Sequence, residues 1–252
     1  ADYFDYIIAD SVLIPKEAQK FYTENVLYLD LAYPTDSKKI SIKNTFTRKD
    51  FNLPKDRFIF CCINNNYKFT PLIFDIWMRI LKEVDQSVLF LNANHEVTKN
   101  NLKREALKRN VDPTRLIFGD KLNYSHFLER LNLMDLFLDT YPFNGHSTAC
   151  DVLWAGLPII TICGDHYASR GCSSLLSAVK LDSLITYNIK DYENLAITLA
   201  KNPEKLRKLK ESLVDKKVLD LFNTNKFTTN IESKYQEVYD HYQRDLPPKT
   251  IN

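Results

Sequence analysis

Glycine is scarce in this sequence, with five residues among 252. Dinucleotide-binding loops and P-loops need several glycines at short fixed spacing, because the backbone there turns tightly and approaches a phosphate closely. No two glycines of this chain stand at either spacing. The sequence therefore excludes a G-x-G-x-x-G dinucleotide loop and a P-loop.

The sequence also lacks a C-x-x-C motif, a long apolar run and a large excess of charge of one sign. The five cysteines include no C-x-x-C pair, which argues against a disulfide framework and against a structural zinc site. The apolar runs are too short to span a bilayer, and no signal peptide opens the chain. Lys and Arg number 34 and Asp and Glu number 32, so the concentrated basic face of a nucleic-acid-binding protein is not expected. We expect a cytoplasmic protein that binds neither membranes nor nucleic acids.

From residue 57 onward, short apolar runs alternate with segments whose apolar residues recur at helical spacing. We predict strands at residues 57–63, 87–91, 115–118, 135–139, 158–162 and 184–186. The predicted helices between them span residues 71–84, 97–109, 125–133, 147–155 and 167–179. Strand–helix alternation at this spacing predicts an α/β fold with a largely parallel, doubly wound, Rossmann-like sheet.

The pattern changes on both sides of this region. Beyond residue 190 it is helical only, and we expect the helices at 191–200, 203–217 and 228–242 to cover the end of the sheet. The first 55 residues contain two short predicted strands, at 6–9 and 26–29, and a polar linker at 31–48. We therefore divide the chain into residues 1–55, 56–190 and 191–252. Because it starts at Ala1 without an initiator methionine, we expect it to be part of a longer protein.

One strand-to-helix loop, residues 139–148, has the features of an anion site. Open α/β sheets bind ligands beyond the carboxyl ends of their strands, where loops lead into helices. The backbone N–H groups and the dipole of a helix start attract anions, so His146, Ser147 and Thr148 could hold a diphosphate without a metal. The alternative is structural, because Thr148-x-x-Asp151 has the form of a capping box.

Two further loops follow predicted strands. Residues 64–68 contain three asparagines, which favour turns, and end at Lys68 just before a helix start. A helix dipole disfavours a cation at that end, and an anion bound between the lysine and the helix would remove the conflict. The alternative is a solvated lysine that points away. The loop at 119–126 is by itself only a surface loop that ends in an N-capping Ser125.

With these loops placed, the sequence resembles the O-GlcNAc transferases. Residues 144–148 (Asn-Gly-His-Ser-Thr) and 151–158 (Asp-Val-Leu-Trp-Ala-Gly-Leu-Pro) are similar to the donor-site stretch of that family. Four more segments agree with the family in order and spacing: residues 67–68, 138–140, 168–170 and 221–224. The similarity extends from about residue 58 to residue 242, includes residues 5–10, and is strongest to bacterial homologues with tetratricopeptide repeats.

The resemblance implies a GT-B glycosyltransferase, in which two Rossmann-like lobes clamp a nucleotide sugar. Residues 56–190 would be the C-terminal, donor-binding lobe, residues 1–55 the tail end of the N-terminal lobe with a linker, and residues 191–252 helices packed on the lobe. The implied reaction is an inverting transfer of GlcNAc from UDP-GlcNAc to Ser/Thr hydroxyls of a protein, without cofactor or metal. The catalytic base, the upstream repeats and the choice of acceptor would belong to the rest of the protein, so this chain alone should not turn over.

The resemblance also assigns roles to individual residues. Lys68 would contact the donor diphosphate and stabilise the leaving nucleotide, which is the catalytic role. His146, Ser147 and Thr148 would hold the same diphosphate at the helix start. Asp151 would accept hydrogen bonds from the ribose hydroxyls.

Further donor-site positions lie in the other two loops. Asn65 matches a family position that often carries another amide side chain. Three further residues match positions that line the nucleobase: Leu122, Tyr124 and Arg130. The family usually has a histidine where this chain has Phe127, and His126 falls one residue short. One residue turns a helical side chain by about 100°, so either the loop shifts by one residue or the base contact is altered.

Two other functions are compatible with this sequence. The donor would be GDP-fucose or another nucleotide sugar if the chain followed the plant SPINDLY-type relatives. Alternatively, the chain would be a non-catalytic binding module, which the shifted His126 favours.

Overall fold

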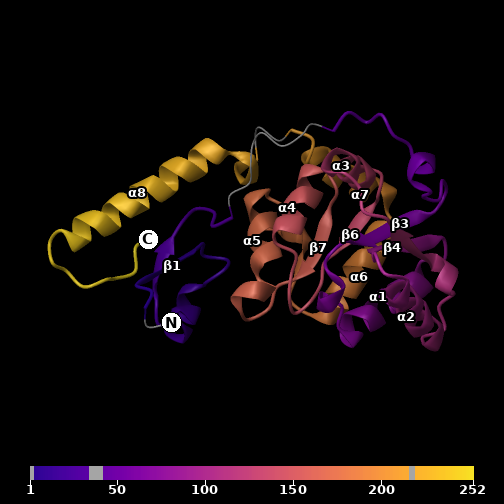
Figure 1. Cartoon of the computed structure of the whole chain (residues 1–252), viewed down its shortest axis with the longest axis horizontal. Helices are drawn as coiled ribbons and strands as arrows, with labels where there is room; N and C mark the ends of the chain where they lie inside the picture. The colour runs from indigo at the N-terminus through magenta and orange to yellow at the C-terminus, as the bar shows by residue number, and fades with distance from the viewer. Residues whose placement is uncertain (1–2, 34–41, 216–218) are drawn as a thin grey trace.

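The computed structural model describes residues 3–33, 42–215 and 219–252. Its main sheet has six strands in the order β5-β4-β3-β6-β7-β8, and every pairing is parallel (Figure 1). The strands are β3 Phe58–Cys62, β4 Ser87–Asn92, β5 Leu116–Gly119, β6 Leu136–Leu138, β7 Ile159–Ile162 and β8 Ile185–Thr186. The chain winds outward from β3 to β5 and then returns to β6 beside β3, which is the doubly wound order. The predicted Rossmann-like α/β sheet is confirmed.

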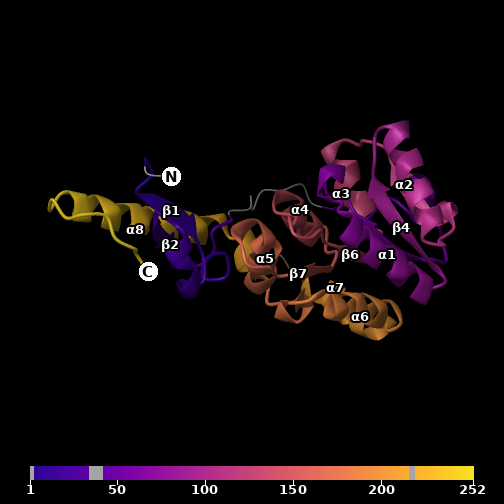
Figure 2. The same cartoon turned by 90° about the horizontal axis from the view of Figure 1, so that it is seen from below.

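The strands are apolar on both sides, and helices cover both faces of the sheet. The helices are α1 Pro71–Glu83, α2 Glu96–Lys108, α3 Tyr124–Asn132, α4 Ser147–Trp154, α5 Gly171–Ala178, α6 Ile189–Ala200 and α7 Pro203–Ser212. Helices α1 and α6 pack together on one face, and α3, α4 and α5 pack side by side on the other (Figure 2). Thr70 caps α1 by accepting a hydrogen bond from the N–H of Ile73, as its position before Pro71 predicts.

The buried face of α1 connects the core to the loop after β6. Trp77 is fully buried, and its indole N–H donates to the hydroxyl of Tyr192 on α6 at 3.3 Å. The Tyr192 hydroxyl in turn donates to the carbonyl oxygen of Asp139 at 2.9 Å. Burying two polar aromatic groups is favourable only when both are hydrogen-bonded, so this pair fixes the end of β6 against both helices.

A second, smaller sheet stands beside the main one. Strands β1 Tyr6–Ala9 and β2 Asn25–Tyr28 pair in parallel, and they pack on a small core of their own that includes Leu13 and Ile14. Two hydrogen bonds connect this small sheet and its core to the start of α5. The Arg170 guanidinium donates to the carbonyl oxygen of Val12, and the Ser174 hydroxyl donates to the buried carboxylate of Asp10 at 2.6 Å.

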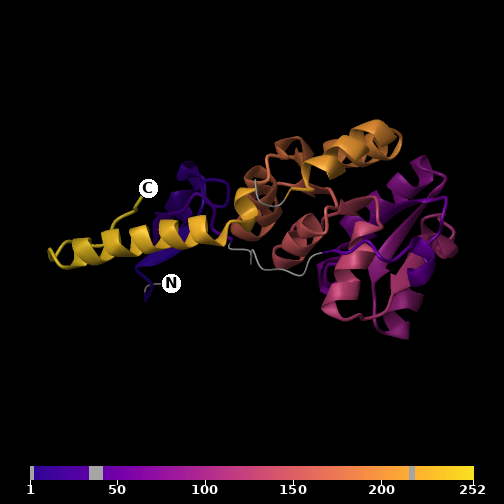
Figure 3. The ribbon, with the colours of Figure 1, turned by 90° about the horizontal axis from the view of Figure 1, so that it is seen from above.

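The last helix does not cover the main sheet. Helix α8, Thr224–Tyr242, lies alongside β1 and β2 (Figure 3), and the chain after it returns to pair Ile251 with Leu27. In the described part of the chain α8 has no buried residue. Helix α6 contacts β6, β7 and β8 of the main sheet, whereas α8 lies alongside the small sheet.

Two sequence predictions extend beyond the described residues. The predicted helix at 203–217 ends at Ser212, and residues 216–218 lie outside the description. The same is true of residues 34–41 within the predicted linker. Within the described residues, no helix combines the length and the apolar character that crossing a bilayer requires.

Candidate functional site

The sheet topology brings two of the predicted loops together. Strands β3 and β6 are neighbours in the sheet although paired positions such as Phe60 and Leu136 are 76 residues apart in the sequence. The chain reverses its winding between them, and the crevice at the carboxyl end of such a reversal is the ligand site of doubly wound folds. The loop with Lys68 follows β3, and the loop with His146 follows β6. The two loops therefore meet where a ligand is expected.

Lys68 contacts the second loop directly. Its ammonium group donates to the carbonyl oxygen of Asn144 at 2.7 Å and lies 3.8 Å from the centroid of the Phe143 ring. The Phe143 ring in turn lies 5.8 Å from the ring of His146. Burial lowers the pKa of Lys68, while the nearby carboxylate of Asp139 opposes that shift. The alternative of a solvated lysine that points away is wrong, and the predicted convergence of Lys68 with the His146 turn is confirmed.

A buried carboxylate holds the second loop in place. Asp139 accepts hydrogen bonds at Oδ1 from the N–H groups of Gly145 and Thr140, at 2.7 and 2.9 Å, and from the side-chain amide of Asn64 at 3.0 Å. At Oδ2 it accepts from the hydroxyl of Thr161 at 2.7 Å. Burial raises the pKa of Asp139 to about 6, against the effect of these hydrogen bonds. Asp139 thus joins the loop after β3, the loop after β6 and strand β7.

The start of α4 differs from the capping-box alternative. The helix begins at Ser147 with His146 as its N-cap residue, and no side chain of the described residues caps it. Thr148 therefore lies inside the first turn, and Asp151 accepts a hydrogen bond from the Tyr124 hydroxyl at 2.7 Å. The capping-box hypothesis is wrong. A helix start without a capping side chain keeps backbone N–H groups that an anion can use.

The side chains at the start of α3 point in different directions. The rings of Tyr124 and Phe127 are stacked with centroids 6.3 Å apart, and Tyr124 is the residue that reaches Asp151. The His126 ring instead packs edge-on against Phe46, with centroids 4.8 Å apart. His126 therefore faces Phe46, whereas Phe127 faces Tyr124 and the start of the helix, and which of the two takes the place of the family's usual histidine stays a prediction.

The other predicted donor-site residues of these two loops lie at different depths. Arg130 is buried, donates from Nη1 to the carbonyl oxygen of Asp120 at 3.0 Å, and stacks its guanidinium 4.9 Å from the Phe90 ring centroid. It supports the loop after β5 from inside. Leu122 is half-buried on that loop, and Asn65 is exposed at the start of the turn before Lys68. Their contacts with a donor stay predictions.

The surroundings of His146 contain residues that the sequence did not indicate. The Tyr33 hydroxyl lies 2.8 Å from Nδ1 of His146, although 113 residues separate the two. The other ring nitrogen, Nε2, is buried and has no hydrogen-bond partner among the described residues. It lies against Gly171, where a Cβ atom would come within 2.0 Å of it. The only sequence signal nearby is the resemblance at residues 168–170, and Tyr33 gave none.

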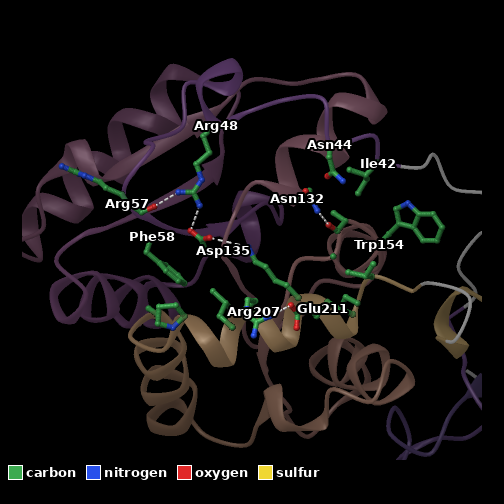
Figure 4. A pocket seen from close by; sticks show the side chains of 18 of the residues that line it. Ile42, Asn44, Arg48, Arg57, Phe58, Asn132, Asp135, Trp154, Arg207 and Glu211 are labelled. Carbon is green, nitrogen blue, oxygen red and sulfur yellow. Dashed lines mark hydrogen bonds and ion pairs between the residues drawn. The ribbon is translucent and has the colours of Figure 1, made fainter.

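A cavity of about 1050 Å³ lies at the opposite end of the sheet (Figure 4). Its walls include Phe58 at the start of β3, Asp135 just before β6, and Trp154 at the end of α4. Arg48 forms an ion pair with Asp135 at 2.8 Å there, and the Lys210 ammonium donates to the carbonyl oxygen of Met134 at 2.6 Å. None of the predicted donor-site residues lines this cavity, and the amino ends of the strands are not where doubly wound sheets bind nucleotides.

Metal ligands do not gather in the described residues. Across residues 3–33, 42–215 and 219–252, no three His, Cys, Asp or Glu side chains are placed to hold a metal ion.

Known proteins with similar sequences are nucleotide-sugar enzymes. The chain is 34% identical over 247 residues to the probable UDP-N-acetylglucosamine–peptide N-acetylglucosaminyltransferase SEC of Arabidopsis thaliana, a match that covers 95% of this chain and 25% of that protein. It is 30% identical to the tomato (Solanum lycopersicum) protein with the same enzyme name and the suffix SPINDLY, over 96% of this chain and 26% of that one. The chain therefore spans about a quarter of the length of these curated relatives.

Solved structures agree with this relationship. A mutant of the O-GlcNAc transferase of Thermobaculum terrenum superimposes with a TM-score of 0.73 at 26% identity, over 95% of this chain and 44% of that one. S. aureus TarM matches with a TM-score of 0.59 at 14% identity over 93% of this chain and 44% of that one, which supports the fold alone. The model of glycosyl transferase family 41 matches residues 35–231. The resemblance seen in the sequence is confirmed, and the chain belongs to glycosyl transferase family 41.

Proposed function

We propose that this chain is the donor-binding half of an inverting, metal-independent glycosyltransferase that moves GlcNAc from UDP-GlcNAc to Ser/Thr hydroxyls of a protein. The observation that carries the proposal is the convergence of Lys68 and the uncapped start of α4 at the point where the sheet reverses its winding. The family membership and the names of the relatives support the choice of reaction. An acceptor protein and the rest of the polypeptide are the partners in this proposal.

The geometry suits the departure of a nucleoside diphosphate. Negative charge grows on the diphosphate as its bond to the sugar breaks, and fixed dipoles and cations aimed at that charge lower the barrier. The hydrogen bond from Lys68 to Asn144 already fixes the ammonium group, so little reorganisation is needed when charge develops. Asp139 keeps the N–H of Gly145 engaged and so fixes the loop that enters α4. Asp151, beside Tyr124, is the proposed acceptor for ribose hydroxyls.

The identity of the base is the second part of the proposal. The sequence offers GDP-fucose as an alternative donor, and Phe127, which aligns with the family's usual histidine and stacks on Tyr124, leaves that alternative open. The names of the relatives refer to UDP-N-acetylglucosamine, and on that ground we choose the UDP-sugar.

Calorimetric titration with UDP and with GDP tests this choice. We expect the protein in its full natural length to bind UDP at least about tenfold more tightly than GDP, which corresponds to about 1.4 kcal/mol of discrimination at the base. We expect EDTA to leave the affinity for UDP unchanged. Tighter binding of GDP would replace the proposed donor with a guanosine-based one, and loss of UDP binding in EDTA would refute metal independence.

A further inference from the structure

The ring of His146 is restrained on both edges. On one edge the Tyr33 hydroxyl lies 2.8 Å from Nδ1. On the other edge Nε2 is enclosed, and Gly171 at the start of α5 leaves just enough room for it, since a Cβ atom there would lie 2.0 Å from Nε2 and 2.1 Å from Cδ2. A ring held in this way cannot rotate without displacing one of its neighbours.

The contact between Tyr33 and His146 joins two neutral groups. Burial and the charge of Lys68 lower the pKa of His146, against the opposing effect of the Ala168 backbone, so the imidazole is neutral near pH 7 and carries a single ring proton. Burial and the neighbouring Tyr167 raise the pKa of Tyr33 well above its ordinary value, so its hydroxyl keeps its proton. The 2.8 Å contact is therefore one hydrogen bond, in which either the Tyr33 hydroxyl donates to Nδ1 or the Nδ1–H donates to the hydroxyl, and each direction belongs to one tautomer of the ring.

We propose that Tyr33 is a positioning residue for the donor site, which acts by fixing the tautomer and orientation of His146 and thereby the start of α4. The proposal rests on the proposed function, because it gives the fixed loop a diphosphate to bind. His146 is the N-cap residue of α4, and in this proposal its fixed ring holds the turn from which the N–H groups of Ser147 and Thr148 project. Tyr33 follows β2, and it carries this restraint from the small sheet to the donor site.

The Tyr33→Phe variant tests the proposal, because it keeps the aromatic ring and removes the hydroxyl. The first measurement is the ¹⁵N NMR shifts of the His146 imidazole near pH 7.5, which distinguish the two tautomers. We expect the original chain to show a single tautomer and the variant to show a mixture of both. The matched control is Tyr235→Phe on the exposed side of α8, which should leave these shifts unchanged.

The second measurement is the affinity for UDP. We expect Tyr33→Phe to weaken UDP binding about 3- to 10-fold, which corresponds to about 0.7–1.4 kcal/mol and is the usual size of one hydrogen bond, with the melting temperature close to that of the original protein. Gly171→Ala approaches the ring from the other edge, and its Cβ would force the imidazole out of its place. It should weaken UDP binding more than Tyr33→Phe does.

The outcomes separate this proposal from the proposed function. Unchanged imidazole shifts in Tyr33→Phe overturn the proposal outright. Altered shifts with unchanged UDP affinity show that the hydrogen bond exists without positioning the donor site, which also overturns it. If the original protein binds no UDP at all, the proposed function fails and Tyr33 loses its role, while the imidazole shifts still report whether the hydrogen bond is present.

Discussion

Replacing Lys68 by methionine should lower the rate of sugar transfer by the full-length protein about 10²- to 10³-fold, the usual effect of removing one fixed group that stabilises charge in the transition state. Methionine keeps most of the length of the side chain and removes its charge. The fold should change little, because Lys68 is only half-buried and donates one hydrogen bond, to the carbonyl oxygen of Asn144. Transfer of labelled GlcNAc from UDP-GlcNAc to a protein acceptor measures the rate, and thermal unfolding monitors the fold.

The matched control for Lys68 is Lys82→Met near the end of α1, where the lysine is exposed. This variant loses the same charge far from the carboxyl edge of the sheet, and its transfer rate should stay within about twofold of the original, as for most surface substitutions. A Lys68→Met protein that transfers sugar as fast as the control would remove Lys68 from the mechanism. Transfer by the unaltered protein would also exclude the non-catalytic alternative.

The sheet was predictable because its strands carry a local signal. A run such as residues 58–62 is apolar at every position, which only a strand covered on both faces tolerates, and helical spacing on either side identifies the crossovers. The same local rules place Lys68 and His146 at strand-to-helix loops. Their convergence followed from the expected topology, since parallel strands present all such loops at one edge.

The remaining features depend on contacts that no local pattern encodes. The capping-box pattern at Thr148 and Asp151 was present in the sequence, but α4 begins one residue before Thr148, so that pattern lies inside the helix. Helix α8 was predicted with nearly its observed length, yet its partner is the small sheet formed by residues more than 190 positions earlier. Tyr33 and His146 are likewise distant in the sequence, 113 residues apart, and contact each other only in the fold. Periodicity identifies elements, whereas packing between distant elements decides which surface each one meets.

The second large effect is expected at Asp139, a buried carboxylate that accepts four hydrogen bonds. Asp139→Ala leaves the N–H groups of Gly145 and Thr140 buried without an acceptor, and each such group costs about 1–3 kcal/mol. We therefore expect the free energy of unfolding to fall by about 3–5 kcal/mol, together with loss of UDP binding. Chemical denaturation and calorimetry measure the two effects.

Asp139→Asn separates the charge of this side chain from its hydrogen bonds. An asparagine oxygen at the Oδ1 position still accepts from Gly145, Thr140 and Asn64, and the amide can donate to the Thr161 hydroxyl, so this variant resembles the protonated aspartic acid. The folded chain holds the pKa of Asp139 at about 6, above the ordinary value of 3.8, so folding favours the protonated form. The stability that protonation provides is fully present below the ordinary pKa and is lost as the pH rises through the folded pKa.

The wild type should therefore gain about 3 kcal/mol relative to Asp139→Asn as the pH falls from above 6 to below 4, since one pKa unit corresponds to about 1.4 kcal/mol. Other carboxylates act in the opposite direction, as the lowered pKa values of Asp112 and Glu96 illustrate. They titrate equally in both proteins, so the difference between the two denaturation curves isolates Asp139. A difference that stays constant from pH 4 to pH 7 would mean that the Asp139 carboxyl is ionised throughout, and that the four hydrogen bonds outweigh its burial.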